Sequence, residues 1–209
     1  IKGIEGAKVF TIRNVVDIIR LKEGVASGKI RDVAVIGGGF IGIETAENLR
    51  KLGKQVTVIE AMDQILAPLD YDFVQMVQKE MMDHGVQVIV GDGVKEIDGS
   101  QVLLASGKAV PAQAVVLAIG VAPETGLARQ AGLEIGETGG IKVDHNYRTS
   151  DENIYAVGDA IEVFQQLTQK PGRLALAGPA LRQARAAADS MYGRPCANKG
   201  VIGSCAIRV

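Results

Sequence analysis

Glycines cluster at residues 37–42, where Gly37, Gly39 and Gly42 follow the spacing G-x-G-x-x-G. An apolar run at 33–36 precedes them and reads as a buried strand, and residues 41–52 read as a helix. Glu60 ends the next apolar run, about 20 residues further on, as the fingerprint requires. Since a strand, a glycine turn, a helix and a second strand ending in an acid occur together, the pattern predicts a dinucleotide-binding loop.

Each position of this loop has a physical role. Gly37 would permit the tight turn, Gly39 would let the backbone approach a pyrophosphate, and Gly42 would let the helix pack closely on the strand. The N–H groups of Phe40 and Ile41, at the helix start, would face the phosphates with the positive end of the helix dipole. The competing interpretation is a glycine turn that only packs a helix on a sheet.

The acid sets the expected cofactor. Glu60 would accept hydrogen bonds from the adenosine ribose and would repel a 2′-phosphate. No Arg or Lys stands between Glu60 and Lys79 to bind such a phosphate. The sequence therefore predicts NAD(H) rather than NADP(H).

The surrounding elements predict an α/β fold with a Rossmann-like parallel sheet. Strands are expected at 33–36, 56–60, 86–90 and 114–119, with helices at 41–52 and 70–84. Residues 94–97 and 101–105, with a turn at 98–100 and a further short strand from Val110, predict an antiparallel β-meander where a crossover helix is usual.

Both flanks have their own patterns. An N-terminal surface helix is expected, with an apolar face formed by Val15, Val16, Ile18 and Ile19 and with Leu21 as a candidate further member. Further along, strands are expected at 141–143, 153–157 and 201–209, and a short helix at 125–132. A helix at 179–191 is expected to pack on a sheet through small residues, which are Ala180, Ala184, Ala187 and Ala188.

Composition excludes several classes of function. The 209 residues have a formal net charge of −1, four Tyr, four Phe and no Trp, and no basic stripe, so nucleic-acid binding is not expected. No apolar stretch reaches the ~20 residues of a membrane span, and no secretory signal or initiator Met is visible. Cys196 and Cys205 have neither redox-pair nor zinc spacing, which predicts packing thiols in a cytoplasmic protein without a metal.

Several segments together resemble the pyridine nucleotide-disulfide oxidoreductase family of flavoenzymes. They are residues 11–14 (TIRN), 35–44 (VIGGGFIGIE), 118–123 (AIGVAP) and 149–160 (TSDENIYAVGDA). The segment 174–185 (LALAGPALRQAR) is most similar to the branch of NADH oxidases, NADH peroxidases and coenzyme A-disulfide reductases. Leu181 and Ala184 depart from the Asn and Gly expected there.

The resemblance implies roles for individual residues. Gly158 and Asp159 would hold FAD, Ala177 would touch the flavin through its backbone, and Arg13 would reach the flavin nucleotide. The N-terminus of helix 179–191 would point at the flavin. Gly120 and Val121 would close the nucleotide site, and Glu44 would lie near the nicotinamide, unless it is an ordinary acid of the first helical turn.

These expectations combine into one hypothesis about the chain. Residues 1–30 are a linker and helix from the FAD domain, 31–143 form the NAD(H)-binding domain, and 144–209 form the C-terminal part of an incomplete FAD domain. The chain is then a central fragment of an FAD-dependent NADH oxidoreductase acting on a small disulfide, peroxide or oxygen. It would contain no catalytic residue and would bind NADH without turnover, with the redox cysteine and a homodimerisation domain outside it.

Two alternatives stay open at this point. One is an NADH-dependent reductase of ferredoxin- or rubredoxin-type partners, which only the cysteine region outside this chain would separate from the first hypothesis. The other is a non-catalytic NAD-binding module that senses redox state.

Overall fold

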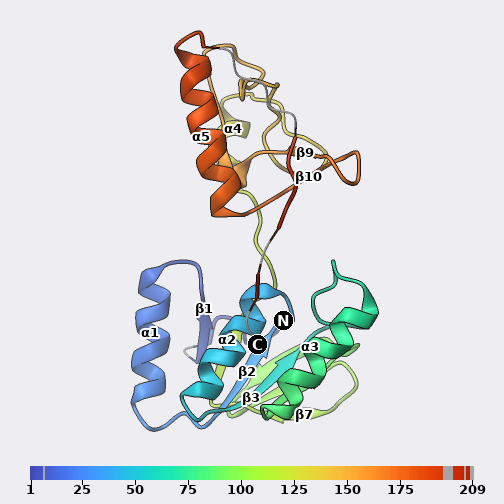
Figure 1. The fold of residues 1–209 in the computed structure, drawn as a ribbon. Helices are drawn as coiled ribbons and strands as arrows, with labels where there is room; N and C mark the ends of the chain where they lie inside the picture. The colour runs from blue at the N-terminus through green and yellow to red at the C-terminus, as the bar shows by residue number, and fades with distance from the viewer. Residues whose placement is uncertain (7, 195–199, 205, 208–209) are drawn as a thin grey trace. The chain divides into compact units, whose positions relative to one another are not determined.

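The computed structural model describes residues 1–6, 8–194, 200–204 and 206–207, and these form two compact units (Figure 1). Unit 1 comprises Ile1–Gly120 with Ala206–Val209, and unit 2 comprises Val121–Cys205. The predicted Cys196 and Cys205 thiols lie outside the described residues. The functional domains expected at 1–30, 31–143 and 144–209 stay a prediction.

Unit 1 is built on a five-stranded parallel sheet of order β1-β8-β2-β3-β4. Its strands are β1 (Val9–Thr11), β8 (Ala114–Leu117), β2 (Asp32–Ile36), β3 (Gln55–Ile59) and β4 (Val86–Ile89). The predicted α/β class and parallel sheet are therefore confirmed. The edge strand β1 was not expected, because three residues are too short for a periodic signal and only its pairing with β8 defines it.

Both faces of this sheet are covered, which explains why its strands are almost continuously apolar. Helices α1 (Val15–Ala26), α2 (Phe40–Lys51) and α3 (Tyr71–Asp83) lie on one face, where Val35, Val58 and Val116 are fully buried (Figure 1). The predicted meander covers the other face as β5 (Val94–Asp98), β6 (Gln101–Leu104) and β7 (Ala109–Pro111). The meander thus supplies the second apolar layer that a crossover helix would otherwise provide.

Helix α1 forms where it was expected but turns a different face inward. Its buried residues are Leu21 and Val25, whereas Val15, Val16, Ile18 and Ile19 are between 49% and 71% exposed. At 100° per residue these four side chains and Leu21 together spread around more than half of the helix, so the five cannot all face one sheet. Of the apolar face that the pattern predicted, only Leu21 is therefore buried.

Unit 2 has little regular structure beyond one long helix. Its elements are α4 (Gly126–Gln130), the 3₁₀ turn η1 (Gly158–Ala160), the two-stranded β9 (Val163–Gln165) and β10 (Lys170–Gly172), and α5 (Ala177–Met191). The strands predicted at 141–143, 153–157 and 201–209 form only isolated bridges within the described residues, at Ile141, Tyr155 and Val201. A short apolar run becomes a strand only where a neighbour pairs along its length, and these runs have no such neighbour.

Helix α5 also turns a different face inward from the one predicted. Its buried residues are Pro179, Gln183, Ala187 and Ser190, while Ala184 and Ala188 are exposed and Ala180 is half-buried. The buried stripe follows helical spacing, but two of its four members are polar, so a search for small apolar positions missed it.

Candidate functional site

The glycine turn between β2 and α2 has the shape that its sequence pattern predicted. Gly37 has φ +109°, and a Cβ at this position would overlap the carbonyl group of Ala118. A Cβ on Gly42 would overlap the carbonyl oxygen of Gly37, so the helix could not approach the turn so closely. A Cβ on Gly39, by contrast, would meet no heavy atom within 4 Å. The turn is thus tight inside and open at the point where a pyrophosphate would approach.

A third glycine contact was not predicted. A Cβ on Gly38 would lie 2.6 Å from Cγ2 of Ile65, and the carbonyl of Gly38 accepts the Leu66 N–H at 2.8 Å. Ile65 and Leu66 are buried in the loop after β3. This loop therefore packs against the glycine turn at Gly38 and supports it. The only sequence signal was a glycine at a position where the fingerprint allows any residue.

Helix α2 presents free donors at its N-terminus. Gly39 is its N-cap residue, and the first helical bond runs from the Ile43 N–H to the Gly39 carbonyl at 3.0 Å. The N–H groups of Phe40, Ile41 and Gly42 precede that bond and point out of the helix end. The first turn of α2 holds no acidic side chain, so no carboxylate of the helix itself competes for the positive end of its dipole.

Glu60 follows β3 and is bonded to the glycine turn itself. Its Oε2 accepts the Gly38 N–H at 2.7 Å, and its Oε1 accepts the Met62 N–H at 2.9 Å. A carboxylate has about four acceptor sites, so two of them stay available for ribose hydroxyls. The Glu60 carboxylate is therefore held against the glycine turn, and the two N–H groups fix its orientation.

The third side of this site is the end of β8. The Ala118 N–H donates to the Ile36 carbonyl at 2.7 Å, which places residues 118–120 beside the glycine turn. The predicted NAD residues Gly37, Gly39, Phe40, Ile41, Gly42, Glu60 and Gly120 thus come from the carboxyl ends of β2, β3 and β8. This is the edge of an open α/β sheet where ligands bind. Val121 belongs to unit 2.

Glu44 lies on the side of α2 that borders the hollow between α1 and α2. Because the helix begins at Phe40, Glu44 stands in the second turn rather than the first. It is exposed and lines a hollow of about 470 Å³ between α1 and α2, together with Ile12, Ile18 and Ile41. Ile41 connects this hollow to the start of the helix, so Glu44 has an open, largely apolar space in front of it.

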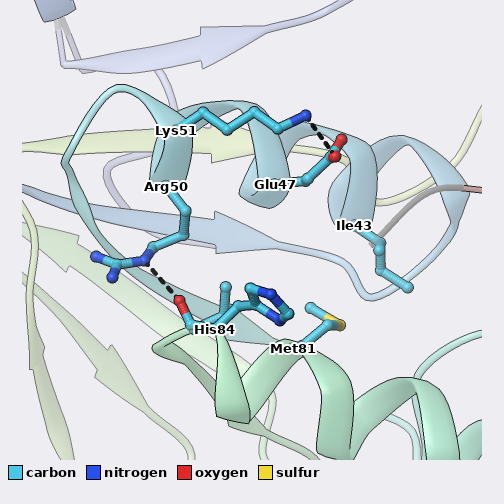
Figure 2. A pocket seen from close by; sticks show the side chains of 7 residues that line it. Ile43, Glu47, Arg50, Lys51, Met81 and His84 are labelled. Atoms are coloured by element: carbon cyan, nitrogen blue, oxygen red, sulfur yellow. Dashed lines mark hydrogen bonds and ion pairs between the residues drawn. The ribbon is translucent and has the colours of Figure 1, made fainter.

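A second hollow, of about 330 Å³, lies between α2 and α3 (Figure 2). Its rim is occupied by the helices' own interactions: Arg50 Nε donates to the His84 carbonyl at 3.2 Å, and Lys51 pairs with Glu47 at 2.6 Å. Arg50 is roughly 15 Å along the helix from Phe40 at 1.5 Å per residue. This hollow therefore extends from Ile43 toward the C-terminal end of α2 and lies between the two helices.

Arg13 lies in unit 1, in the connection between β1 and α1. Its backbone N–H donates to Oδ2 of Asp17 at 2.9 Å, and the Thr11 hydroxyl donates to the same oxygen at 2.7 Å. The Thr11 hydrogen bond and, after it, the Arg13 N–H hold the pKa of the Asp17 carboxyl below its usual range. Asn14 caps the helix by accepting the Asp17 N–H at 3.0 Å. The backbone on both sides of Arg13 is thereby fixed.

The other predicted flavin residues lie together in unit 2. Gly158 begins η1 with φ +79°, and its N–H donates to Oε1 of Gln183 on α5 at 2.7 Å. Asp159 is exposed at the next position, and Ala177 is exposed in the first turn of α5. The helix begins two residues before the expected Pro179, which is tolerated at the third helical position because no intrahelical bond needs its missing N–H.

Neither a membrane span nor a metal cluster is found in the part of the chain that the structure describes. No helix there is both long and apolar enough to cross a bilayer. No three His, Cys, Asp or Glu side chains among the same residues are grouped so that they could hold a metal ion.

Comparison with known proteins gives close and consistent matches. The profile of the family described as pyridine nucleotide-disulphide oxidoreductase matches residues 1–184. Among solved structures, reduced Bacillus anthracis CoADR-RHD is 43% identical with a TM-score of 0.97, and the match covers 100% of this chain and 38% of that one. A NAD-dependent persulfide reductase from A. fulgidus is 37% identical with a TM-score of 0.96, over 100% of this chain and 39% of that one.

Curated relatives extend the comparison to other acceptors. A probable ferredoxin reductase of Castellaniella defragrans is 36% identical over 92% of this chain and 48% of its own length. Other relatives are named NADH oxidase and NAD(P)H sulfur oxidoreductase (CoA-dependent). The chain spans less than half the length of each of these relatives.

Proposed function

Because this chain belongs to the pyridine nucleotide-disulphide oxidoreductase family, we propose that it is the NADH-binding part, with half of the FAD-binding part, of an FAD-dependent NADH oxidoreductase. The observation that carries the proposal is the glycine turn, which is closed to a side chain at Gly37 and Gly42 and open at Gly39. A turn that only packed a helix on a sheet would not need open space at Gly39 or an acid tied to its backbone.

Unit 1 would bind NADH in an extended form along the edge of the sheet. The pyrophosphate would lie against Gly39 and accept hydrogen bonds from the N–H groups of Phe40 and Ile41. Glu60 would accept from the adenosine ribose hydroxyls. At the other end, the nicotinamide would extend toward Glu44 and Gly120, so that the helix dipole neutralises the phosphates while the reactive ring stays outside the helix end.

Selectivity for NADH over NADPH would come from the carboxylate of Glu60. A 2′-phosphate would stand beside an acid that two backbone N–H groups already hold in place, so the acid could not swing away without losing both bonds. Like charges placed together in this way cost several kcal/mol.

Unit 2 would provide part of the FAD site. Asp159 would accept from a ribityl hydroxyl, and the N-terminus of α5, with Ala177 in its first turn, would face the flavin ring. Arg13, in unit 1, stays a predicted contact of the flavin nucleotide. Bound FAD would supply hydride acceptance from NADH and electron transfer to a disulfide, peroxide or oxygen. The residues of this chain would bind and orient both nucleotides, and the chain by itself would bind NADH without turnover.

The acceptor separates this proposal from a second candidate. The relative from C. defragrans, a probable ferredoxin reductase, is as similar as the sulfur-directed relatives, which favours an iron–sulfur protein as the alternative acceptor. Activity of the complete protein with a purified ferredoxin but not with a disulfide, peroxide or oxygen would decide for this candidate.

Amide resonances of the isotopically labelled chain test where NADH binds. On addition of NADH, residues 37–42, Glu60 and Gly120 should shift together, whereas Arg50 and His84 at the second hollow should not. Shifts confined to the second hollow, or no shifts at millimolar NADH, would contradict the proposal. A non-catalytic sensor would differ in the complete protein, which would then show no NADH-dependent reduction of bound flavin.

A further inference from the structure

The buried face of α5 contains an amide side chain. Gln183 is only 2% exposed and stands one turn before Ala187, which packs in the core of unit 2 with Ile161. Burying an amide among apolar side chains costs free energy unless its polar atoms are hydrogen-bonded. A buried glutamine therefore needs a specific hydrogen-bond partner that offsets the free-energy cost of burying its amide.

That partner is the first residue of the η1 turn. The chain reaches Gly158 in an extended conformation at Val157 and then reverses direction with φ +79°. The reversal turns the Gly158 N–H toward α5, where Oε1 of Gln183 accepts it at 2.7 Å. A Cβ on Gly158 would lie 3.7 Å from Cβ of Ala180, so the turn also lies close to the helix one helical turn earlier.

The turn is fixed at both ends, and the acid lies between them. Gln183 holds the start at Gly158, and Ile161, 1% exposed, anchors the end in the core while its N–H donates to the Gly158 carbonyl at 3.3 Å. Asp159, between these anchors, is exposed. Its carboxylate therefore takes its direction from a backbone that Gln183 restrains.

We propose that Gln183 is a positioning residue of the flavin half-site: by holding the Gly158 N–H it fixes the backbone from which Asp159 reaches the ribityl chain of FAD. This inference rests on the proposed flavin role of Asp159. Glutamate at position 183 would keep an acceptor oxygen at the same distance from α5, whereas methionine would fill a similar volume without any acceptor for the Gly158 N–H.

The test uses the complete protein that carries this chain, stripped of flavin and titrated with FAD by fluorescence. Gln183→Met should weaken FAD binding about tenfold, the effect of one lost hydrogen bond to a partly buried N–H group. Hydrogen exchange of peptides covering residues 157–161 should accelerate by a similar factor. Gln183→Glu should recover part of both properties relative to Gln183→Met, because it keeps the acceptor oxygen although a carboxylate is costlier to bury than an amide. Ser190→Ala, on the same buried stripe two turns later, should change neither.

Each contrary result points to a different error. If Gln183→Met leaves FAD affinity unchanged while Asp159→Ala weakens it, the inference about Gln183 is wrong and the flavin role of Asp159 stands. If Asp159→Ala also leaves FAD affinity unchanged, the proposed flavin role is wrong and the inference falls with it. Equal losses in Gln183→Met and Ser190→Ala, without recovery in Gln183→Glu, would reduce Gln183 to ordinary packing.

Discussion

In unit 1 the glycine turn at 37–39 is held by three strands, a helix and the loop at 65–66. In unit 2 the turn at 158–160 is held by Gln183 of α5, by the buried Ile161 and by the Ile141 N–H, which donates to the Ala160 carbonyl at 2.8 Å. The parallel strands of unit 1 are covered on both faces, while the described part of unit 2 has two paired strands of three residues each. A site supported by a sheet that is covered on both faces can be complete within its own unit. A turn held by one helix and a few isolated contacts depends more on what else surrounds it.

The largest effect is expected from Gly37→Ala, which should break the site of unit 1. The new Cβ would overlap the Ala118 carbonyl in a backbone conformation that alanine rarely adopts, and the strained conformation alone costs about 1–3 kcal/mol. NADH binding should fall at least about 100-fold, because the displaced turn no longer fits a pyrophosphate to within an ångström. Calorimetric titration measures this loss.

Gly28→Ala is the matched control for this variant. Gly28 has φ +74° but nothing within 4 Å of its Cβ position, and it lies at the end of α1. It should lose stability from the backbone conformation and keep NADH affinity. Equal loss of affinity in both variants would show that the overlap at Ala118 is irrelevant.

Truncating the core of unit 2 should lower the stability of unit 2 without changing NADH binding by unit 1. Ile161→Ala removes a side chain that is 1% exposed and should cost unit 2 about 2–5 kcal/mol. NADH affinity should not change, because the residues that hold the glycine turn belong to unit 1.

The reciprocal variant Val58→Ala, in the core of unit 1, should lower NADH affinity and leave unit 2 intact in urea unfolding. A loss of NADH binding in Ile161→Ala would contradict the self-contained site.

Changing the charge of Glu60 should have a smaller but selective effect. Glu60→Gln keeps the size of the side chain, but its NH₂ group would face one of the two backbone N–H groups that the carboxylate now accepts. NADH should bind about tenfold more weakly. The ratio of NADH affinity to NADPH affinity should fall, because no carboxylate then repels the 2′-phosphate of NADPH. Glu47→Gln, at the second hollow on α2, should bind both nucleotides like the wild type.

The smallest effect is expected on the pH dependence of stability, through Asp17, which fixes the connection that contains Arg13. The pKa of Asp17 is lowered in the folded protein, so its ionised form stabilises the fold above the carboxyl's ordinary titration range and this contribution is lost as the pH falls below about 4. Asp17→Ala should flatten that part of the stability profile measured by urea unfolding between pH 5 and 2.5. Glu23→Gln on the same helix should leave the profile unchanged, and an identical flattening there would refute the assignment to Asp17.

The sequence predicted the glycine turn well because its determinants are local. Gly37, Gly39 and Gly42 act within six residues, and Glu60 follows at the end of the next strand. The meander was equally predictable, because a two-residue turn between β5 and β6 is a short-range signal.

What the sequence could not predict depends on distant contacts. The support of Gly38 by Ile65 joins residues 27 positions apart, and the bond from Gly158 to Gln183 joins residues 25 apart. Periodicity also gave the wrong face for α5, since it cannot tell a buried glutamine with a partner from an exposed one. The strands expected at 141–143 and 153–157 failed for a related reason: hydropathy finds apolar runs but not their neighbours.

Titration of the 209-residue chain with NADH and with NADPH, side by side in a calorimeter, tests the central claim most directly. A complete NADH site in unit 1, with Glu60 fixed toward the ribose, predicts that NADH binds at one site per chain and at least about tenfold more tightly than NADPH. Equal or tighter binding of NADPH, or no binding of either nucleotide by the folded chain, would contradict it.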